Sequence, residues 1–250
     1  MKGAITVFSP PHLAALAFSA WLTAFLCRKS AEMSRENLDR MLKVFAVMAV
    51  LFDPIYWIWE IKTFGHIKPA TTLPLYLCSI YWIMMPFAVF SKKSRLRQTA
   101  QAAVCTLGLI GGVLGLVLNV YIDRFGFFHF VPIRSMLYHL LMVVSAAVMW
   151  YSGYYKPQKR DRTACFAPVI PMLFISLILN RLYGWDYCYT AGGPGTPLEL
   201  VSRRMPQPIF LMLFYGVLLL FIQLVFYRRF MPAFNRETVQ SEKHPPLTAK

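Results

Sequence analysis

One thiol and one imidazole in apolar surroundings are the side chains of this sequence best suited to covalent chemistry. Cys78 lies in the stretch 71–80 (TTLPLYLCSI), and His139 follows Tyr138 in a later apolar run. A cysteine thiolate attacks carbonyl carbons, and a neighbouring imidazole acting as a base raises the population of that thiolate. The two residues therefore predict a Cys–His site, with Cys78 as the nucleophile and His139 as the general base.

Further polar side chains lie in or beside the apolar runs. Ionisable groups are costly in such surroundings and mark a functional site by default. The predicted supporting or binding residues are His12, Asp53, Glu60, Tyr76, Tyr138, Asn180 and Asp186. Asp53 and Glu60 are two helical turns apart and share a helix face, so either can orient the imidazole. Asn180 can polarise a carbonyl or bind an oxyanion.

The same residue types also have structural interpretations. A free cysteine packs as a small hydrophobe, and a polar side chain in a membrane span often bonds to a neighbouring helix. The glycines at 108, 111, 112 and 115 form overlapping G-x-x-x-G patterns, which predict close helix packing. The residues alone therefore leave three classes open: a thiol-dependent enzyme, a sensor or transporter that binds a small ligand, and a structural membrane protein.

The composition indicates that these residues belong to a membrane protein. Hydrophobic residues make up 57% of the 250 residues and charged residues 15%, which is too apolar for a soluble domain. The net charge of +15 comes from basic residues between the apolar runs, where they contact lipid headgroups. We therefore expect membrane lipids as partners and no nucleic acid. The five scattered cysteines predict no disulfide framework, and no metal or cofactor is expected.

Seven apolar runs are long enough to predict membrane helices. They cover about 11–27, 41–59, 72–90, 99–121, 134–151, 165–182 and 208–226, and Pro74 is predicted to lie at the start of the third helix. These runs predict an all-α fold, a polytopic bundle of seven transmembrane helices. Residues 1–230 are expected to form one domain, followed by a polar, disordered cytoplasmic tail over 231–250.

The basic residues also predict the orientation of the chain. Most of the 26 Lys and Arg residues lie in alternate loops, around 28–43, 91–98 and 156–162, and at the C-terminal end. Because cytoplasmic loops are enriched in Lys and Arg, the N-terminus is expected outside and the C-terminus in the cytoplasm. In that orientation the predicted site residues all fall in the outer half of the bundle. We therefore expect an outward-opening polar pocket there.

Several motifs, taken in order, resemble one known family. They are LPLYLC at 73–78, the pair Tyr138-His139 after an aromatic-rich loop, and Leu179-Asn180 followed by 184–187. A Gly- and Pro-rich loop then precedes the last span. The chain resembles the YwaF-like family of bacterial integral membrane proteins over about 12–227. A mammalian multipass acyltransferase that remodels ether phospholipids is distantly similar to that family.

The resemblance implies a seven-helix bundle, a bacterial cell membrane and thiol-dependent acyl transfer between lipids. The family thiol corresponds to Cys78 and the family histidine to His139. Two positions depart from the family pattern, because Tyr76 stands where a histidine is common and Asp186 where an asparagine is usual. We therefore expect Cys78 to take an acyl group from a phospholipid as a thioester and to pass it to a lysophospholipid.

Overall fold

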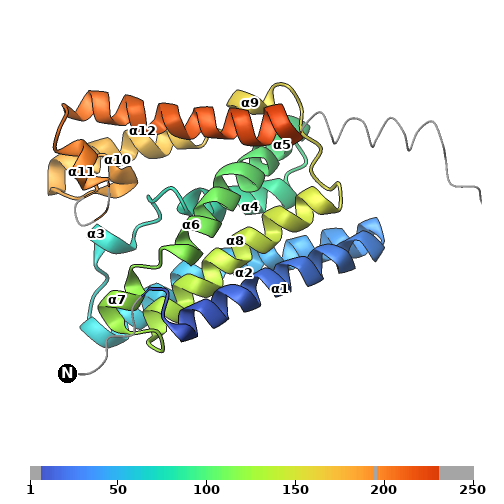
Figure 1. The fold of residues 1–250 in the computed structure, drawn as a ribbon, viewed down its shortest axis with the longest axis horizontal. Helices are drawn as coiled ribbons and strands as arrows, with labels where there is room; N and C mark the ends of the chain where they lie inside the picture. The colour runs from blue at the N-terminus through green and yellow to red at the C-terminus, as the bar shows by residue number, and fades with distance from the viewer. Residues whose placement is uncertain (1–6, 194–195, 197, 231–250) are drawn as a thin grey trace, which may run out of the picture.

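The computed structural model describes residues 7–193, 196 and 198–230. Every regular element in this part of the chain is a helix, which agrees with the predicted all-α fold class (Figure 1). The predicted cytoplasmic tail over 231–250 and part of the Gly- and Pro-rich loop lie outside the described residues. The extent of a single domain over 1–230 stays a prediction.

The helices follow one another with short connections. The longer ones are α1 (Pro10–Glu32), α2 (Arg35–Phe64), α4 (Ser79–Phe90), α5 (Ser94–Ala103), α6 (Leu109–Val117), α8 (Phe130–Tyr151), α10 (Val169–Tyr183) and α12 (Gln207–Ile222). The short ones are α3 (Pro69–Thr72), α7 (Tyr121–Phe125), α9 (Asp161–Ala164), η2 (Tyr187–Tyr189) and α11 (Glu199–Ser202). Two π-helices complete the order, since η1 (Val104–Gly108) joins α5 to α6 and η3 (Gln223–Phe230) continues α12.

Six helical segments in the described residues are long and apolar enough to cross a membrane. They are Pro10–Glu32, Arg35–Phe64, Ser94–Phe125, Phe130–Tyr151, Asp161–Tyr183 and Gln207–Arg228. They coincide with six of the seven predicted spans, so the chain is a multipass membrane protein. The seventh, α4, has 12 residues, and at about 1.5 Å per residue it is about 18 Å long. Since the hydrocarbon core is about 30 Å thick, a crossing here also needs the segment before α4. That seventh crossing and the orientation of the termini stay predictions.

The helix predicted over 72–90 is interrupted at its beginning. Helix α3 ends at Thr72, Leu73 has an extended backbone, and α4 begins only at Ser79. Proline disfavours helical geometry in the residue before it and has no N–H to donate. The prediction of a continuous helix from residue 72 is therefore wrong, and Pro74 lies in the break rather than at a helix start.

Helix α8 is the centre of the main bundle. It packs against α1, α2 and α6, while α4 packs against α2 and α5. Figure 1 shows α1, α2 and α8 running side by side, with α10, α11 and α12 as a separate layer along one edge. Helix α8 is mostly buried, whereas α1 and α12 leave large apolar side chains such as Trp21 and Met212 exposed. Such exposed apolar faces are suited to contact with lipid chains.

Two glycines of α6 allow it to approach α8 closely. A Cβ at Gly112 would lie 2.9 Å from Val143 Cγ2 and 3.0 Å from the carbonyl oxygen of His139. A Cβ at Gly115 would lie 2.2 Å from the imidazole of His139. Real Cβ atoms do not approach neighbours so closely. The predicted close packing at these glycines is therefore confirmed, and the partner helix is α8.

Candidate functional site

Cys78 and His139 lie against the same face of α6, one turn apart. The Cβ of Cys78 is 3.9 Å from the position that a Cβ would occupy at Gly111, and His139 Nε2 is 2.2 Å from the equivalent position at Gly115. Residues four apart on a helix have Cβ positions about 6 Å apart. Cys78 Cβ and His139 Nε2 are therefore at most about 12 Å apart. Within the described residues no hydrogen bond joins the two side chains. Helix α6 thus offers a glycine surface that holds a thiol and an imidazole near each other.

The hydrogen bonds of His139 define which ring nitrogen is free. Its Nδ1 lies 2.8 Å from the carbonyl oxygen of Ser135 and 3.3 Å from Ser135 Oγ. Because a carbonyl oxygen only accepts, Nδ1 carries the hydrogen, and Nε2 of the neutral ring carries the lone pair. Nε2 lies against Gly115, on the face of α6 that Cys78 also contacts. This tautomer is the one that a general base acting through Nε2 requires.

Cys78 ends the irregular segment 73–78, directly before the first residue of α4. The backbone of this segment bonds to side chains from other elements. Leu73 N–H donates to Tyr187 Oη at 3.0 Å, the Cys188 thiol donates to the Leu75 carbonyl at 3.1 Å, and Tyr138 Oη donates to the Cys78 carbonyl at 3.3 Å. Irregular backbone at membrane depth is tolerated only where protein buries it or where it lines a cavity. In transporters such breaks form binding sites.

An ion pair that the sequence reasoning missed lies beside the thiol. Arg134 Nη2 donates to Asp53 Oδ1 at 2.5 Å and to the Phe52 carbonyl at 3.3 Å. The two charged side chains are only 18% and 14% exposed, and the guanidinium lies 4.5 Å from the ring centre of Tyr56. The guanidinium also lies 6.0 Å from the ring centre of Tyr138, whose hydroxyl donates to the Cys78 carbonyl. The sequence does contain a signal for this ion pair, because Arg134 stands at the start of an apolar run, where a charge is costly without a partner.

The ion pair also corrects a predicted role. Asp53 was expected to be one of two carboxylates able to orient the imidazole. Its recorded side-chain partner is Arg134, while Nδ1 of His139 is held by Ser135. A carboxylate next to a guanidinium gains more from that bidentate-capable cation than from a neutral ring. Within the described residues the orienting group of His139 is therefore Ser135, in the preceding turn of α8.

Glu60, the other predicted orienting carboxylate, supports the backbone instead. It is 1% exposed, and its Oε2 accepts hydrogen bonds from Thr72 Oγ1 at 2.6 Å and from Lys68 N–H at 3.2 Å. These partners lie in and just before α3. Glu60, near the end of α2, thus holds Lys68 and Thr72 against that helix, and segment 73–78 begins directly after Thr72.

Asn180 closes the loop that follows α10. Its Oδ1 accepts from Tyr187 N–H at 3.0 Å, and its Nδ2 donates to the Tyr187 carbonyl at 2.8 Å and to Thr190 Oγ1 at 2.6 Å. Both donor hydrogens of the amide are thereby used. In this structure Asn180 has none left for the oxyanion of a substrate, which was the role expected for it.

Asp186 holds the same loop from the other side. Its carboxylate accepts from Ala191 N–H at 2.6 Å and from Gly193 N–H at 2.9 Å. Burial raises the pKa of this carboxyl, and the two N–H groups oppose that rise in part. Asp186 therefore shapes the Gly-rich turn rather than the surroundings of Cys78.

His12 connects α1 to the end of α6. It is fully buried, Phe8 N–H donates to its Nδ1 at 2.9 Å, and its Nε2 lies 2.8 Å from the Leu116 carbonyl oxygen. Since Nδ1 accepts, Nε2 carries the hydrogen and donates it to that carbonyl. Both ring nitrogens are therefore engaged by backbone, which leaves none for proton transfer to a substrate.

Aromatic side chains enclose the segment that carries Cys78. Tyr76 packs edge-on against Tyr187 with ring centres 4.9 Å apart, and Tyr138 packs edge-on against Phe52 at 5.4 Å. The η2 turn that supplies Tyr187 has positive φ angles of 53° at Cys188 and 56° at Tyr189. Non-glycine residues rarely adopt such angles, and they persist where the surroundings impose them.

The structure therefore divides the predicted site residues into two groups. One group lies in or around the break before α4 and consists of Cys78, His139, Tyr138, Tyr76 and Asp53. The other group holds backbone groups in place and consists of His12, Glu60, Asn180 and Asp186. Two pockets are described, one between α2 and α4 and one between the loop at 191–192 and the start of α12. Neither is the predicted polar pocket, since neither includes Cys78 or His139. In the described residues no three His, Cys, Asp or Glu side chains are grouped to hold a metal.

Comparison with known proteins identifies the family. A family model described as the TMEM164 family matches residues 7–227, which is most of the chain. The chain therefore belongs to the TMEM164 family, a family of multipass membrane proteins. No curated protein and no solved structure matches the chain.

Proposed function

We propose that this member of the TMEM164 family is a thiol-dependent phospholipid acyltransferase. The observation that carries the proposal is the arrangement of Cys78 and His139 on the glycine face of α6, with a lone pair on His139 Nε2. The family match itself supports only an integral membrane protein. The YwaF-like resemblance supports lipid acyl transfer and a location in the bacterial cell membrane.

The proposed reaction has two half-reactions. In the first, Nε2 of His139 takes the proton of the Cys78 thiol, and the sulfur attacks the ester carbonyl carbon of a phospholipid. The C–O bond breaks, the departing oxygen takes the proton from the imidazolium, and a lysophospholipid leaves. In the second, the hydroxyl of another lysophospholipid gives its proton to Nε2 and attacks the thioester. The C–S bond breaks and the sulfur recovers a proton, so no cofactor is consumed.

The position of Cys78 along α4 supports an ester substrate. Pro86 of α4 faces residues in the middle of α2 (Arg35–Phe64), and Cys78 precedes Pro86 by eight residues. Eight helical residues span about 12 Å. Half of the hydrocarbon core is about 15 Å thick. If the middle of α2 lies at the centre of the membrane, the thiol is near the hydrocarbon boundary, where ester groups join lipid chains to headgroups.

The cation beside the thiol supports a phospholipid in particular. Arg134 is half-buried between Asp53 and the ring of Tyr56, and it lies 6.0 Å from the ring centre of Tyr138, which bonds to the Cys78 carbonyl. A guanidinium is well suited to a phosphate because its planar donors match the phosphate oxygens. A phosphate a few ångströms outside the ester would meet this group.

Lipid transfer by purified protein tests the proposal. Protein in nanodiscs is incubated with phosphatidylcholine and isotope-labelled lysophosphatidylcholine, and labelled diacyl product is measured. We expect Cys78→Ala and His139→Gln to abolish transfer. Cys27→Ala, which removes a half-buried thiol elsewhere, is the matched control and should retain it. Undiminished transfer by Cys78→Ala would overturn the proposal.

A second candidate is a sensor or transporter that binds a small ligand in the same region. The observation that favours it is a helix break near a half-buried ion pair, an arrangement found at the binding sites of transporters. Under this alternative Cys78→Ala is silent, while Arg134→Gln abolishes thermal stabilisation of the detergent-purified protein by its ligand. The two functions therefore differ in which substitution matters.

A further inference from the structure

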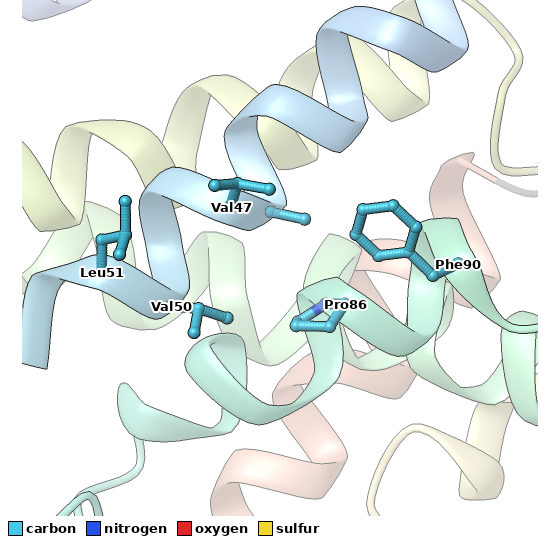
Figure 2. Close-up of a pocket in the computed structure, with 6 residues that line it drawn as sticks. Val47, Val50, Leu51, Pro86 and Phe90 are labelled. Carbon is cyan, nitrogen blue, oxygen red and sulfur yellow. The ribbon is translucent and has the colours of Figure 1, made fainter. Parts of the chain in front are cut away.

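A narrow apolar groove opens between α2 and α4 (Figure 2). It is lined by Ala46, Val47, Val50, Leu51, Pro86 and Phe90 and has a volume of about 170 Å³. Ala46 is buried, and Val47 and Phe90 are half exposed. No lining side chain is polar, so the groove suits a hydrocarbon group and excludes a headgroup.

A proline in each helix and a tryptophan of α4 fix the position of the two helices near Val50. Pro54 lies inside α2 and has no N–H, so the Val50 carbonyl lacks its partner four residues on. The indole N–H of Trp82 on α4 donates to that carbonyl at 3.2 Å and fixes the two helices against each other. One turn further along α4, Pro86 reaches the groove. The groove is therefore bounded by a specific contact between the helices.

The size of the groove indicates what it can hold. At about 30 Å³ for each water-sized group, a volume of about 170 Å³ accommodates about six methylene groups. A stable protein interface buries more than about 1,000 Å² of surface. The surface of the six side chains around so small a groove is less than that area. A single unbranched chain fits the groove, whereas a partner helix does not.

The groove continues the line of groups that the proposed reaction uses. Trp82, Pro86 and Phe90 recur at four-residue intervals along α4, and Cys78 lies four residues before Trp82, directly before the helix. Asp53 follows the groove residue Leu51 by two positions on α2. Its partner Arg134 lies 6.0 Å from the ring centre of Tyr138, whose hydroxyl donates to the Cys78 carbonyl. A cation and a thiol thus lie at one end of an apolar groove, as the phosphate and the ester lie at one end of the acyl chain of a phospholipid.

We propose that the α2–α4 groove binds the middle of the acyl chain that Cys78 accepts and that it determines which chain lengths are transferred. This inference rests on the proposed acyltransferase function. Pro86 is about 12 Å beyond Cys78 along α4, and an extended chain advances about 1.2 Å per bond. About ten bonds are therefore needed to reach Pro86. An octanoyl chain ends before Pro86, while a palmitoyl chain passes Pro86 and reaches Phe90.

Chain-length dependence of transfer tests the proposal. Val47→Phe places a ring at the exposed rim of the groove, and because the Val47 side chain is half exposed, the larger ring does not enter the buried core. We expect transfer of palmitoyl groups from phosphatidylcholine to fall about fivefold and transfer of octanoyl groups to stay unchanged. Val44→Phe, on an exposed part of α2 outside the groove, is the matched control and should change neither. Equal loss for both chains, no loss for palmitoyl, or the same loss in Val44→Phe would overturn the proposal.

A binding experiment separates this inference from the proposed function. Cys78→Ser protein in nanodiscs is irradiated with a phosphatidylcholine that carries a diazirine in the middle of one chain. We expect labelling of 46–51 and 86–90 above that of the exposed α1 residues Phe18 and Trp21, and less labelling in Val47→Phe. Equal labelling of α1, or a second copy of the chain over the groove, would overturn the site. Selective labelling together with undiminished transfer in Cys78→Ala would keep the chain-binding groove and refute the reaction.

Discussion

Gly115→Ala is the substitution that most directly tests whether the fold positions His139. The added Cβ would lie 2.2 Å from both Cδ2 and Nε2 of the imidazole and 2.5 Å from Cγ. Carbon atoms in contact are about 3.5–4.0 Å apart, so the ring has to move by more than about 1 Å. Its Nδ1–H bond to the Ser135 carbonyl, 2.8 Å long, then lengthens or breaks.

The expected change in stability is small because two effects oppose each other. Overpacking costs about 1–3 kcal/mol, and alanine in place of glycine inside a helix contributes about 1 kcal/mol of stability. We therefore expect Gly115→Ala to lower the free energy of unfolding by about 0–2 kcal/mol. Displacement of a catalytic group by about 1 Å costs about a hundredfold in rate. Acyl transfer per folded molecule should fall by that much.

Other glycines of the same stretch form a graded control series. A Cβ at Gly108 meets its nearest atoms at 3.8 Å, which is an ordinary contact, and one at Gly111 meets Met142 Cε at 3.4 Å. Gly108→Ala should retain full transfer, and Gly111→Ala should lose little of it. The assay is lipid transfer in nanodiscs, with thermal unfolding measured on the same preparations.

Two results would refute the reasoning about Gly115. Full transfer by Gly115→Ala would mean that the position of the imidazole is irrelevant to the reaction. An equal loss of transfer in all three alanine variants would mean that helix packing, rather than contact with His139, explains the effect.

Three further substitutions test the roles that the structure gives to polar residues. Asp53→Asn leaves Arg134 unneutralised in apolar surroundings and should lower the free energy of unfolding by about 3 kcal/mol. Adding Arg134→Gln should restore part of that loss, and denaturant titration in detergent measures the stability of both variants. If the effects of the two substitutions simply add in the double variant, the pairing is contradicted. His12→Ala removes two hydrogen bonds to backbone groups and should lower the free energy of unfolding by about 1–3 kcal/mol. Acyl transfer per folded molecule should stay unchanged, and a loss of transfer without a loss of stability would contradict the structural role of His12. Burial raises the pKa of Asp186 in the folded protein, so its contribution to stability is present below the ordinary pKa of 3.8 and is lost as pH rises through the pKa of the folded state. Asp186→Asn should therefore flatten the dependence of the unfolding temperature on pH between acid and neutral pH. An unchanged pH profile would contradict this assignment.

The sequence by itself determines the membrane architecture of this protein. Long apolar runs can only be helices in a membrane, because every backbone N–H and C=O must find a partner without water. Six of the predicted spans are therefore present as helices of sufficient length. The glycine pattern on α6 likewise predicted a close helix contact, since small residues let two backbones approach. Both conclusions depend on local residue types alone.

The break before α4 marks where local reasoning ended. Hydropathy treats 72–90 as one apolar run, yet Leu73 and Pro74 stop the helix and α4 begins six residues after Leu73. The irregular segment is stable because Tyr187, Cys188 and Tyr138 supply hydrogen-bond partners from distant parts of the chain. No property of 72–90 alone indicates that those partners are available.

Only the tertiary structure decided which polar residues surround Cys78 and which support the backbone. His12 bonds to a carbonyl 104 positions away, and Asp53 pairs with Arg134, which is 81 positions away. A buried polar group must be satisfied, but its residue type does not tell whether the partner is backbone, another side chain or a substrate. That choice depends on which elements meet at one depth. In this structure His139 has one imidazole nitrogen facing α6, one helical turn from Cys78, whereas both nitrogens of His12 are engaged by backbone groups.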